Sequence, residues 1–178
     1  MVVGNIRNIS FRTHHYCMDS LSPLDKSFYQ SLLSNPITMR GIGKPLTQVA
    51  ASKRFQQDIL SLQKPLKRSL LWVIKSNDDQ SKLGLIGIAQ RKRFENNWEL
   101  GVILKHGVIN QGIAKEVIVG FMEKVLKNYQ IDMLLGRIKP DNAISIALVT
   151  SLGFRHFASD DKYQYWLWGK NRLEMKVA

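Results

Sequence analysis

Residues 97–117 read NWELGVILKHGVINQGIAKEV, and along this stretch the pattern changes from strand to helix. The opening part, Asn97 to Leu104, is short, apolar and rich in Trp, Val and Ile, which is typical of a strand. From Gly112 onwards apolar residues recur three and four positions apart, which predicts a helix as far as about Asn128. A turn at residues 110–112 should therefore lead from the strand into a helix N-terminus.

Such a helix start has a chemical use. The first four N–H groups of a helix have no partner within it, and the aligned peptide dipoles place about half a positive charge there. Gly112 would let the backbone approach a ligand closely, and the small Ala114 would leave room in the first turn, so an anion such as pyrophosphate is a suitable guest. A purely structural turn is the alternative, because a glycine before a helix is common.

Outward from this stretch the chain alternates between strands and helices. Three helix starts are indicated: Ser22 with Asp25 matches a capping box, and Thr47 and Asn142 are N-cap candidates. Gly153 is placed to end a helix. Further strands are predicted over residues 6–13, 70–76, 83–93, 133–139, 154–158 and 163–168, and further helices over 23–33, 47–62 and 142–152. The second of these helices should face the core with Val49, Phe55, Ile59 and Leu62. This order predicts an α/β fold around a mixed sheet.

Size and composition indicate one domain over residues 1–178. Hydrophobic residues make up 44% of the chain, enough for a core. The longest uncharged apolar run, residues 83–89, is far below the roughly 18 residues of a membrane span, and the first residues do not resemble a signal peptide. We therefore expect a soluble, cytoplasmic protein. Metal-type side chains gather only at residues 14–17, and without further ligands at fixed spacing we interpret them as polar strand-end residues, with no metal.

Charge is concentrated in the first half of the chain. The net charge is +12, and residues 1–93 hold 15 Lys and Arg against 5 Asp and Glu. The densest groups include Lys53 with Arg54, and Arg91, Lys92 and Arg93. Such a field attracts acidic proteins or polyanions and repels polycations, although each group by itself is usually a solvated face.

Two motifs carry a resemblance to a known family. Residues 97–117, followed by DNAISIALVTSLGF at residues 141–154, resemble the GNAT superfamily of N-acetyltransferases and within it the RimJ/RimL-like branch. In that family a glycine-containing strand precedes a Gly-Gln-Gly-x-Ala turn, and Asn-x-x-Ser and Gly-Phe come later. Gly101, Gly112, Asn142 and Ser145 occur here in that order. The resemblance implies the GNAT fold, with a mixed, mostly antiparallel sheet flanked by helices.

The resemblance also implies acetyl-CoA as cosubstrate. The backbone of Ile103 and Leu104 would pair with the pantetheine arm as an added strand does. Main-chain amides of the turn would hold the pyrophosphate, Lys115 would lie near the outer phosphate or adenosine, and Asn142 would bond the pantetheine. The amides concerned are those of Asn110, Gln111, Gly112, Ile113 and Ala114. The sequence departs from the family motif at Ile109 and Asn110, which main-chain binding tolerates.

Catalysis requires a proton acceptor for the amine and a donor for the departing thiolate. Glu99 is the candidate base, because alternation places it on the same strand face as Gly101; pairing with an Arg or Lys is the alternative. The family often uses a tyrosine as the acid, but this chain has Val149 there. Ser145 is a substitute donor, or else caps or packs its helix. A main-chain amide near Val102 or Ile103 would meet the oxyanion.

These observations predict an acetyl-CoA-dependent N-acetyltransferase whose acceptor is a protein N-terminus, such as that of a ribosomal protein, or another amine. An acidic or ribosome-associated acceptor would suit the basic first half. One alternative is a small-molecule amine acetyltransferase, which the charge of +12 disfavours for polycations. Another is a CoA-associated or RNA-associated binding module with weak catalysis, because the usual acid is missing.

Overall fold

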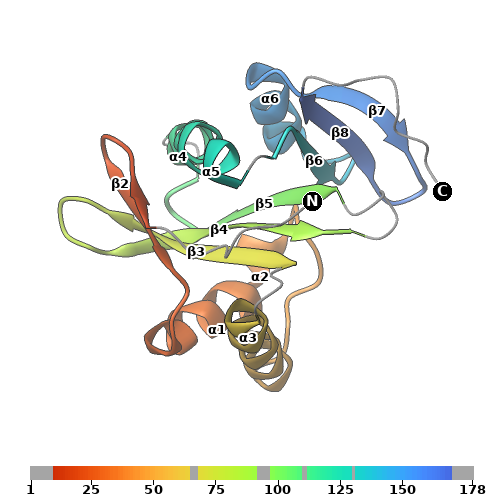
Figure 1. The fold of residues 1–178 in the computed structure, drawn as a ribbon. Coiled ribbons are helices and arrows are strands. Elements are labelled where there is room, and N and C mark those ends of the chain that lie inside the picture. Colours follow the sequence, from red (N-terminus) through yellow and green to blue (C-terminus); the bar gives the residue numbers. More distant parts are fainter. Residues whose placement is uncertain (1–9, 65–67, 92–96, 110–111, 130, 170–178) are drawn as a thin grey trace.

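The computed structural model describes residues 10–64, 68–91, 97–109, 112–129 and 131–169. Its centre is one sheet of eight strands (Figure 1). In chain order these are β1 (Phe11–Arg12), β2 (Tyr16–Ser20), β3 (Ser69–Ser76), β4 (Lys82–Gln90), β5 (Trp98–Leu104), β6 (Met133–Ile138), β7 (Arg155–Ser159) and β8 (Gln164–Gly169). They lie in the order β1-β2-β3-β4-β5-β6-β8-β7, and β5 with β6 is the one parallel pair among them. The predicted mixed, mostly antiparallel sheet is confirmed.

Helices cover both faces of the sheet (Figure 1). One face carries η1 (Pro23–Asp25), α1 (Lys26–Ser34), α2 (Pro36–Met39) and α3 (Gln48–Gln63). The other carries α4 (Ile113–Phe121), the π-helical η3 (Met122–Leu126), α5 (Lys127–Tyr129) and α6 (Ala143–Ser151). Strand alternation divides the core between these layers. In β3, Trp72 packs towards the α4 side while Val73 packs towards the α1 side.

Most predicted helix boundaries are confirmed, because they depend on local capping. The Asp25 carboxylate accepts a hydrogen bond from Ser22 N at 2.9 Å, as a capping box requires. Thr47 Oγ1 caps α3 through Ala50 N at 3.2 Å, and Asn142 Oδ1 caps α6 through Ser145 N at 3.1 Å. Gly153, with a φ of +83°, follows the end of α6 as predicted.

Four features differ from the prediction. Strand β2 and the short helix α2 were not expected. Asn35 and Pro36 do end α1, but the Asn35 side chain also caps α2 by accepting from Ile37 N at 2.9 Å. The helix after Gly112 widens into a π-helical stretch, in which the consecutive residues Val125 and Leu126 are both buried.

The fourth difference is Val49, which is 81% exposed and does not face the core. The buried positions of α3 are Ala51 and Phe55, and Val49 lies about 200° around the helix from Ala51. The predicted strand over residues 6–13 is described only from residue 10 and appears there as β1, and residues 6–9 lie outside the described part.

Candidate functional site

The parallel strands β5 and β6 separate towards their carboxyl ends. They pair only through Trp98 with Leu134, Glu99 with Leu135, and Leu100 with Gly136. Beyond that point β5 continues to pair with β4 as far as Leu104, and β6 continues to pair with β8 as far as Ile138. Among the described residues, nothing in the sheet pairs with the β6-facing edge of β5 at residues 101–104. We call this opening between the two strands the fork.

The fork gives β5 an edge to which an extended molecule can add. Ile103 and Leu104, the residues expected to pair with a pantetheine arm, both lie on this edge. Gly101 pairs with Gly87 without a register shift, so there is no bulge at this position. It is exposed, and no described atom lies within 4 Å of where its Cβ would be. The open edge therefore has unpaired backbone and room beside it.

Helix α4 starts where the chain returns from the fork. Gly112, its N-cap, is exposed, has a φ of +76° and makes no side-chain cap. That left-handed conformation favours glycine, and no described atom lies within 4 Å of where its Cβ would be. The first hydrogen bond of the helix runs from Glu116 N to Gly112 O at 3.1 Å, which leaves the amides of Ile113 to Lys115 without an intrahelical partner. Asn110 and Gln111 lie outside the described residues.

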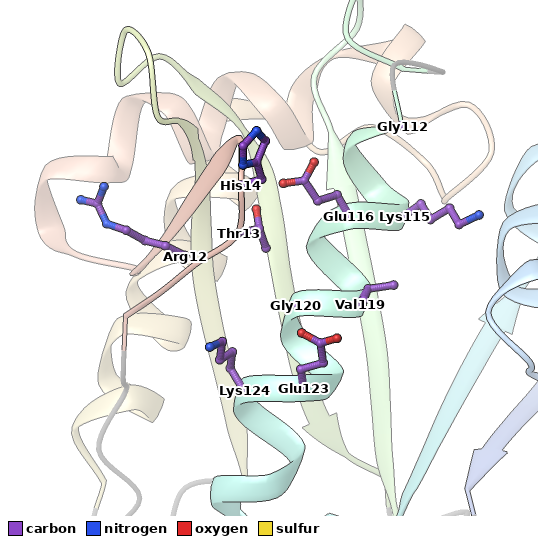
Figure 2. Close-up of a pocket in the computed structure, with 10 residues that line it drawn as sticks. All are labelled: Arg12, Thr13, His14, Gly112, Lys115, Glu116, Val119, Gly120, Glu123 and Lys124. Carbon is purple, nitrogen blue, oxygen red and sulfur yellow. The ribbon is translucent and has the colours of Figure 1, made fainter.

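The charges in the first turn of α4 point in different directions (Figure 2). Glu116 is turned to the Thr13–His15 segment, where it accepts from His15 N at 2.9 Å and contacts the His15 ring Nδ1 at 2.8 Å. Burial raises the pKa of Glu116, but these hydrogen bonds outweigh it and hold the pKa below the ordinary value. Lys115 extends away from this segment (Figure 2). A positive field therefore remains on the Lys115 side of the helix start.

A hollow of about 450 Å³ lies on the β1 side of α4 (Figure 2). It is lined by Arg12, Thr13, His14, Gly112, Lys115, Glu116, Val119, Gly120, Glu123 and Lys124. A Cβ at Gly120 would clash with the Thr13 side chain, so the helix and this segment approach each other closely here. Because the open backbone edge belongs to the fork, the fork and the Lys115 side of α4 form the better candidate site.

Glu99 lies where β5 and β6 begin to separate. Its side chain is only 12% exposed and is held by two guanidinium groups. Arg91 Nε donates to Oε2 at 2.9 Å, while Arg137 Nη2 approaches Oε1 at 3.4 Å. The Arg137 guanidinium also lies over the Tyr163 ring, 4.6 Å from its centroid. The pairing alternative for Glu99 is thus what the structure shows, at the position expected for a base.

Asn142 and Ser145 lie at the carboxyl end of the other strand of the fork. Besides capping α6, Asn142 donates from Nδ2 to Gly41 O at 3.0 Å. Ser145 is half-buried in the first turn of α6, and its backbone N–H is the group that Asn142 caps. Val149, at the position of the family tyrosine, is buried and has no proton to donate. Glu99, Ile103, Leu104, Asn142 and Ser145 therefore lie on or soon after the two strands of the fork, and Gly112 begins the helix that follows β5.

Three participants in this site were missed in the sequence: Arg91, Arg137 and Gly41. The strand register contained a signal for Arg91, since Gln90 pairs with Trp98 and the next residue lies diagonal to Glu99. Arg137 and Gly41 come from segments distant in sequence, and no local pattern announces their contacts. Among the described residues, no group of three or more His, Cys, Asp and Glu is placed to hold a metal ion. No helix in the described part is long and apolar enough to cross a membrane.

Comparison with known proteins bears on the chemistry of the fork. The family model described as an acetyltransferase (GNAT) domain matches residues 17–155. No curated protein sequence matches the chain. Among solved structures, an acetyltransferase from Agrobacterium tumefaciens superposes with a TM-score of 0.78 at 20% identity, covering 91% of this chain and 95% of that one.

Two other structural neighbours have acceptors named in their descriptions. A ribosomal-protein-S5-alanine acetyltransferase from Vibrio fischeri superposes with a TM-score of 0.72 at 14% identity, covering 93% of this chain and 99% of that one. A spermidine N-acetyltransferase from Vibrio cholerae, in complex with CoA and spermine, superposes with a TM-score of 0.69 at 13% identity, covering 85% of this chain and 92% of that one. At these identities the likeness concerns the fold, and the two neighbours act on different acceptors.

Proposed function

The chain belongs to the acetyltransferase (GNAT) domain family, and from that premise we propose that it transfers an acetyl group from acetyl-CoA to the amine of a protein N-terminus. The observation that carries the proposal is the match over residues 17–155, together with a fork that opens beside an uncapped helix start. We propose further that the protein belongs to the RimJ/RimL-like branch, on the motif residues Gly101, Gly112, Asn142 and Ser145.

The residues around the fork fit acetyl-CoA. The open edge of β5 at Ile103 and Leu104 suits the pantetheine arm, whose amides can pair as an added strand does. The exposed Gly112 and the unpartnered amides of Ile113 to Lys115 suit the pyrophosphate, with the Lys115 side chain near the outer phosphate or adenosine. Asn142 has a second N–H on Nδ2 with which to bond the pantetheine. The main-chain amides of Asn110 and Gln111 are proposed to bind the pyrophosphate as well, on the basis of the family motif alone.

Acetyl-CoA, when bound, supplies an activated acetyl thioester. The protein must then remove a proton from the amine, and we assign this task to Glu99, directly or through a water molecule. Glu99 shares a face of β5 with Gly101. Its Oε1 has only the longer contacts, at 3.4 Å from Arg91 Nη2 and at 3.4 Å from Arg137 Nη2, so this oxygen is the less firmly engaged of the two. A main-chain amide near Val102 or Ile103 would meet the developing oxyanion, and the Ser145 hydroxyl would donate to the thiolate in place of Val149.

The acceptor is proposed to be an acidic or ribosome-associated protein, because the net charge of +12 attracts such partners. A small-molecule amine is the second candidate, and one observation favours it. A hollow of about 370 Å³ is lined by Asp160 and Asp161, which could attract a cation, although Arg137 and Lys162 line it as well. Asp160 already accepts hydrogen bonds from Tyr165 Oη and from the Lys162 and Tyr163 amides, so much of its capacity is in use.

An acetylation panel tests the proposal. The protein is incubated with acetyl-CoA and with N-terminal peptides of ribosomal proteins, intact acidic ribosomal proteins, spermidine and an aminoglycoside, and CoA release is measured. Faster transfer to the peptides or proteins is the expected outcome, whereas faster transfer to spermidine or the aminoglycoside would favour the second candidate. Binding of acetyl-CoA without transfer to any acceptor would identify a binding module instead.

A further inference from the structure

One short segment contacts the carboxyl ends of both strands of the fork. Thr38 Oγ1, at the end of α2, accepts a hydrogen bond at 3.2 Å from the N–H of His106, which follows β5. Gly41 O, three residues later, accepts one at 3.0 Å from Nδ2 of Asn142, which follows β6. We call residues 38–41 the bridging segment, because it joins the two strands at the end of the fork where they do not pair with each other.

The bridging segment is firmly held on its other side. Thr38 is only 5% exposed, and Met39 is buried in the core between α1, α3 and the sheet. Asn35 Oδ1 fixes the start of α2 by accepting from the N–H groups of Ile37 and Thr38. Met39 O then accepts from Ile42 N and Gly43 N at 3.0 and 2.9 Å. The carbonyl of Gly41 is therefore presented to Asn142 by a supported turn.

The orientation of the Asn142 amide is fixed by its partners. Its Oδ1 accepts from a backbone N–H, and its Nδ2 donates to a backbone C=O, so exchanging the two atoms would lose both bonds. The same amide thus caps α6 and holds the bridging segment. Since an amide nitrogen has two N–H groups, one remains for a ligand lying in the fork.

The bridging segment lies on the face of the sheet from which an amine would reach Glu99. Met39 and Ile103 belong to the same core cluster on the α1–α3 side, and alternation along β5 places Glu99 on the side of Ile103. The opposite face is covered by α4 and α6 (Figure 1). An acceptor directed at Glu99 therefore passes the bridging segment, whereas a ligand on the open edge of β5 passes Asn142.

We propose that the Asn142–Gly41 hydrogen bond makes the bridging segment part of the acceptor site, and that it couples acceptor binding to cofactor binding. This inference rests on the proposed acetyltransferase function. Asn142 and Gly41 are positioning residues for the amine: a ligand that fixes the Asn142 amide also fixes the Gly41 turn. By linkage, the acceptor must then tighten CoA binding by the same factor by which CoA tightens acceptor binding. One net hydrogen bond corresponds to a factor of about two to ten.

Gly41→Ala breaks this bond. A Cβ at Gly41 would lie 2.7 Å from Asn142 Nδ2, and since that atom is the end of a flexible side chain, the amide would swing away rather than unfold the turn. Gly43→Ala is the matched control in the same turn, because its Cβ would meet only Met39 Cε at 3.9 Å among the described atoms. Neither glycine has a positive φ.

The test measures the Kd of CoA by calorimetry, with and without a saturating concentration of the best N-terminal peptide of the panel. In the unaltered protein and in Gly43→Ala, the peptide should tighten CoA binding about fivefold. In Gly41→Ala this gain should vanish, and the Kd of CoA alone should rise about twofold to tenfold, because the displaced Asn142 amide also loses its proposed bond to the pantetheine. In turnover, Gly41→Ala should raise the peptide KM about fivefold and leave kcat nearly unchanged.

Asn142→Asp provides an independent check, because it keeps an oxygen for the α6 cap and removes the donor to Gly41. Combined with Gly41→Ala it should cause no further loss of coupling, since both changes remove the same bond. An equal peptide effect in Gly41→Ala and Gly43→Ala, or no peptide effect in the unaltered protein, would overturn the inference. Absence of any CoA binding to the unaltered protein would instead overturn the proposed function on which it rests.

Discussion

The two helices that follow the strands of the fork begin in opposite ways. Helix α6, after β6, is completed by the protein itself: Asn142 caps its first turn and the same side chain joins Gly41. Helix α4, after β5, begins at Gly112 with no side-chain cap. Both helices are nine residues long, so their dipoles are similar. The difference fits the proposal that one helix start has a structural use and that the other binds a ligand.

The comparison extends to the other helices. Asn35 caps α2 and Thr47 caps α3 with their side chains, and the carboxylate of Asp25 serves the turn before α1. These helix starts, like that of α6, are thus closed by a side chain of the protein. At α4 the sequence supplies glycine in a left-handed conformation, which exposes the backbone amides. Changes at Gly112 and Asp25 should therefore have different consequences, the first for binding and the second for stability.

The largest expected effect is that of Gly112→Asp on cofactor affinity. A carboxylate at this position would stand where the pyrophosphate is proposed to bind, and the Kd of acetyl-CoA should rise more than a hundredfold, about 3 kcal/mol or more. Gly112→Asn is the matched control, because Asn has the same size and tolerates a positive φ but carries no charge. Calorimetry measures both. Equal affinities for the Asp and Asn variants would remove the electrostatic argument for an anion site at α4.

The next effect concerns Glu99. If this carboxylate accepts the amine proton, Glu99→Gln should lower kcat roughly a hundredfold, leave the Kd of acetyl-CoA nearly unchanged and flatten the acidic limb of the pH–rate profile. Glu123→Gln, which alters an exposed carboxylate of η3, should change none of these quantities. If the Glu99 variant keeps full kcat and loses only stability, its pairing with Arg91 and Arg137 is structural and a water molecule accepts the proton.

A smaller effect is expected at Asp25, whose side chain is 7% exposed and lies 2.6 Å from Lys82 Nζ. Burial raises the pKa of Asp25, but hydrogen bonds from Lys82 and Ser22 outweigh it, so the pKa lies below the ordinary 3.8. The carboxylate therefore stabilises the fold above pH 3.8, and this contribution is lost as the pH falls through the folded-state pKa. Asp25→Asn should cost about 2 kcal/mol of unfolding free energy at pH 7.

Urea titrations at pH 7 and at pH 3 measure this loss. The difference between Asp25→Asn and the unaltered protein should shrink at the lower pH, because a protonated Asp25 resembles Asn. Acetyl-CoA affinity at pH 7 should be the same in both proteins. If Asp25→Asn bound acetyl-CoA more weakly, the proposal that the helix start at Asp25 is structural and that the one at Gly112 binds the ligand would be contradicted.

The features that sequence predicted well are those encoded within a few residues. The Ser22–Asp25 cap, the Thr47 and Asn142 caps and the glycine after α6 each depend on one turn of backbone, and all are confirmed. The β3–β4 hairpin was likewise predictable, from two β-branched runs around a polar loop. Strand β2 was missed because YCMDS is short and has a polar second half, with no alternation to announce it.

Contacts between distant segments were not predictable in this way. Arg137 reaches Glu99 because β6 pairs in parallel with β5, and Gly41 reaches Asn142 because the turn after α2 lies against the segment that follows β6. These contacts depend on how the sheet is assembled, and a single sequence contains no record of it. The family resemblance supplied the assembly in outline. It could not supply Gly41 or Arg137, which are absent from the motifs that carry it.

The smallest effect is expected for the basic first half, whose proposed role is to recruit an acidic macromolecular acceptor. Reversing the exposed residues Lys53, Lys64 and Arg68 to Glu should raise the KM for an acidic ribosomal protein about fivefold at low salt, chiefly by slowing encounter. The effect should fade above about 0.1 M salt, where exposed charges are screened beyond about 10 Å. Reversing the exposed Lys124, Lys127 and Arg155 of the second half is the control and should change this KM less. A short peptide should be insensitive to both reversals, since it does not extend over the basic surface. If both triple variants raise the KM equally, or if the peptide responds as strongly as the protein, net charge alone acts and the first half has no recruiting role.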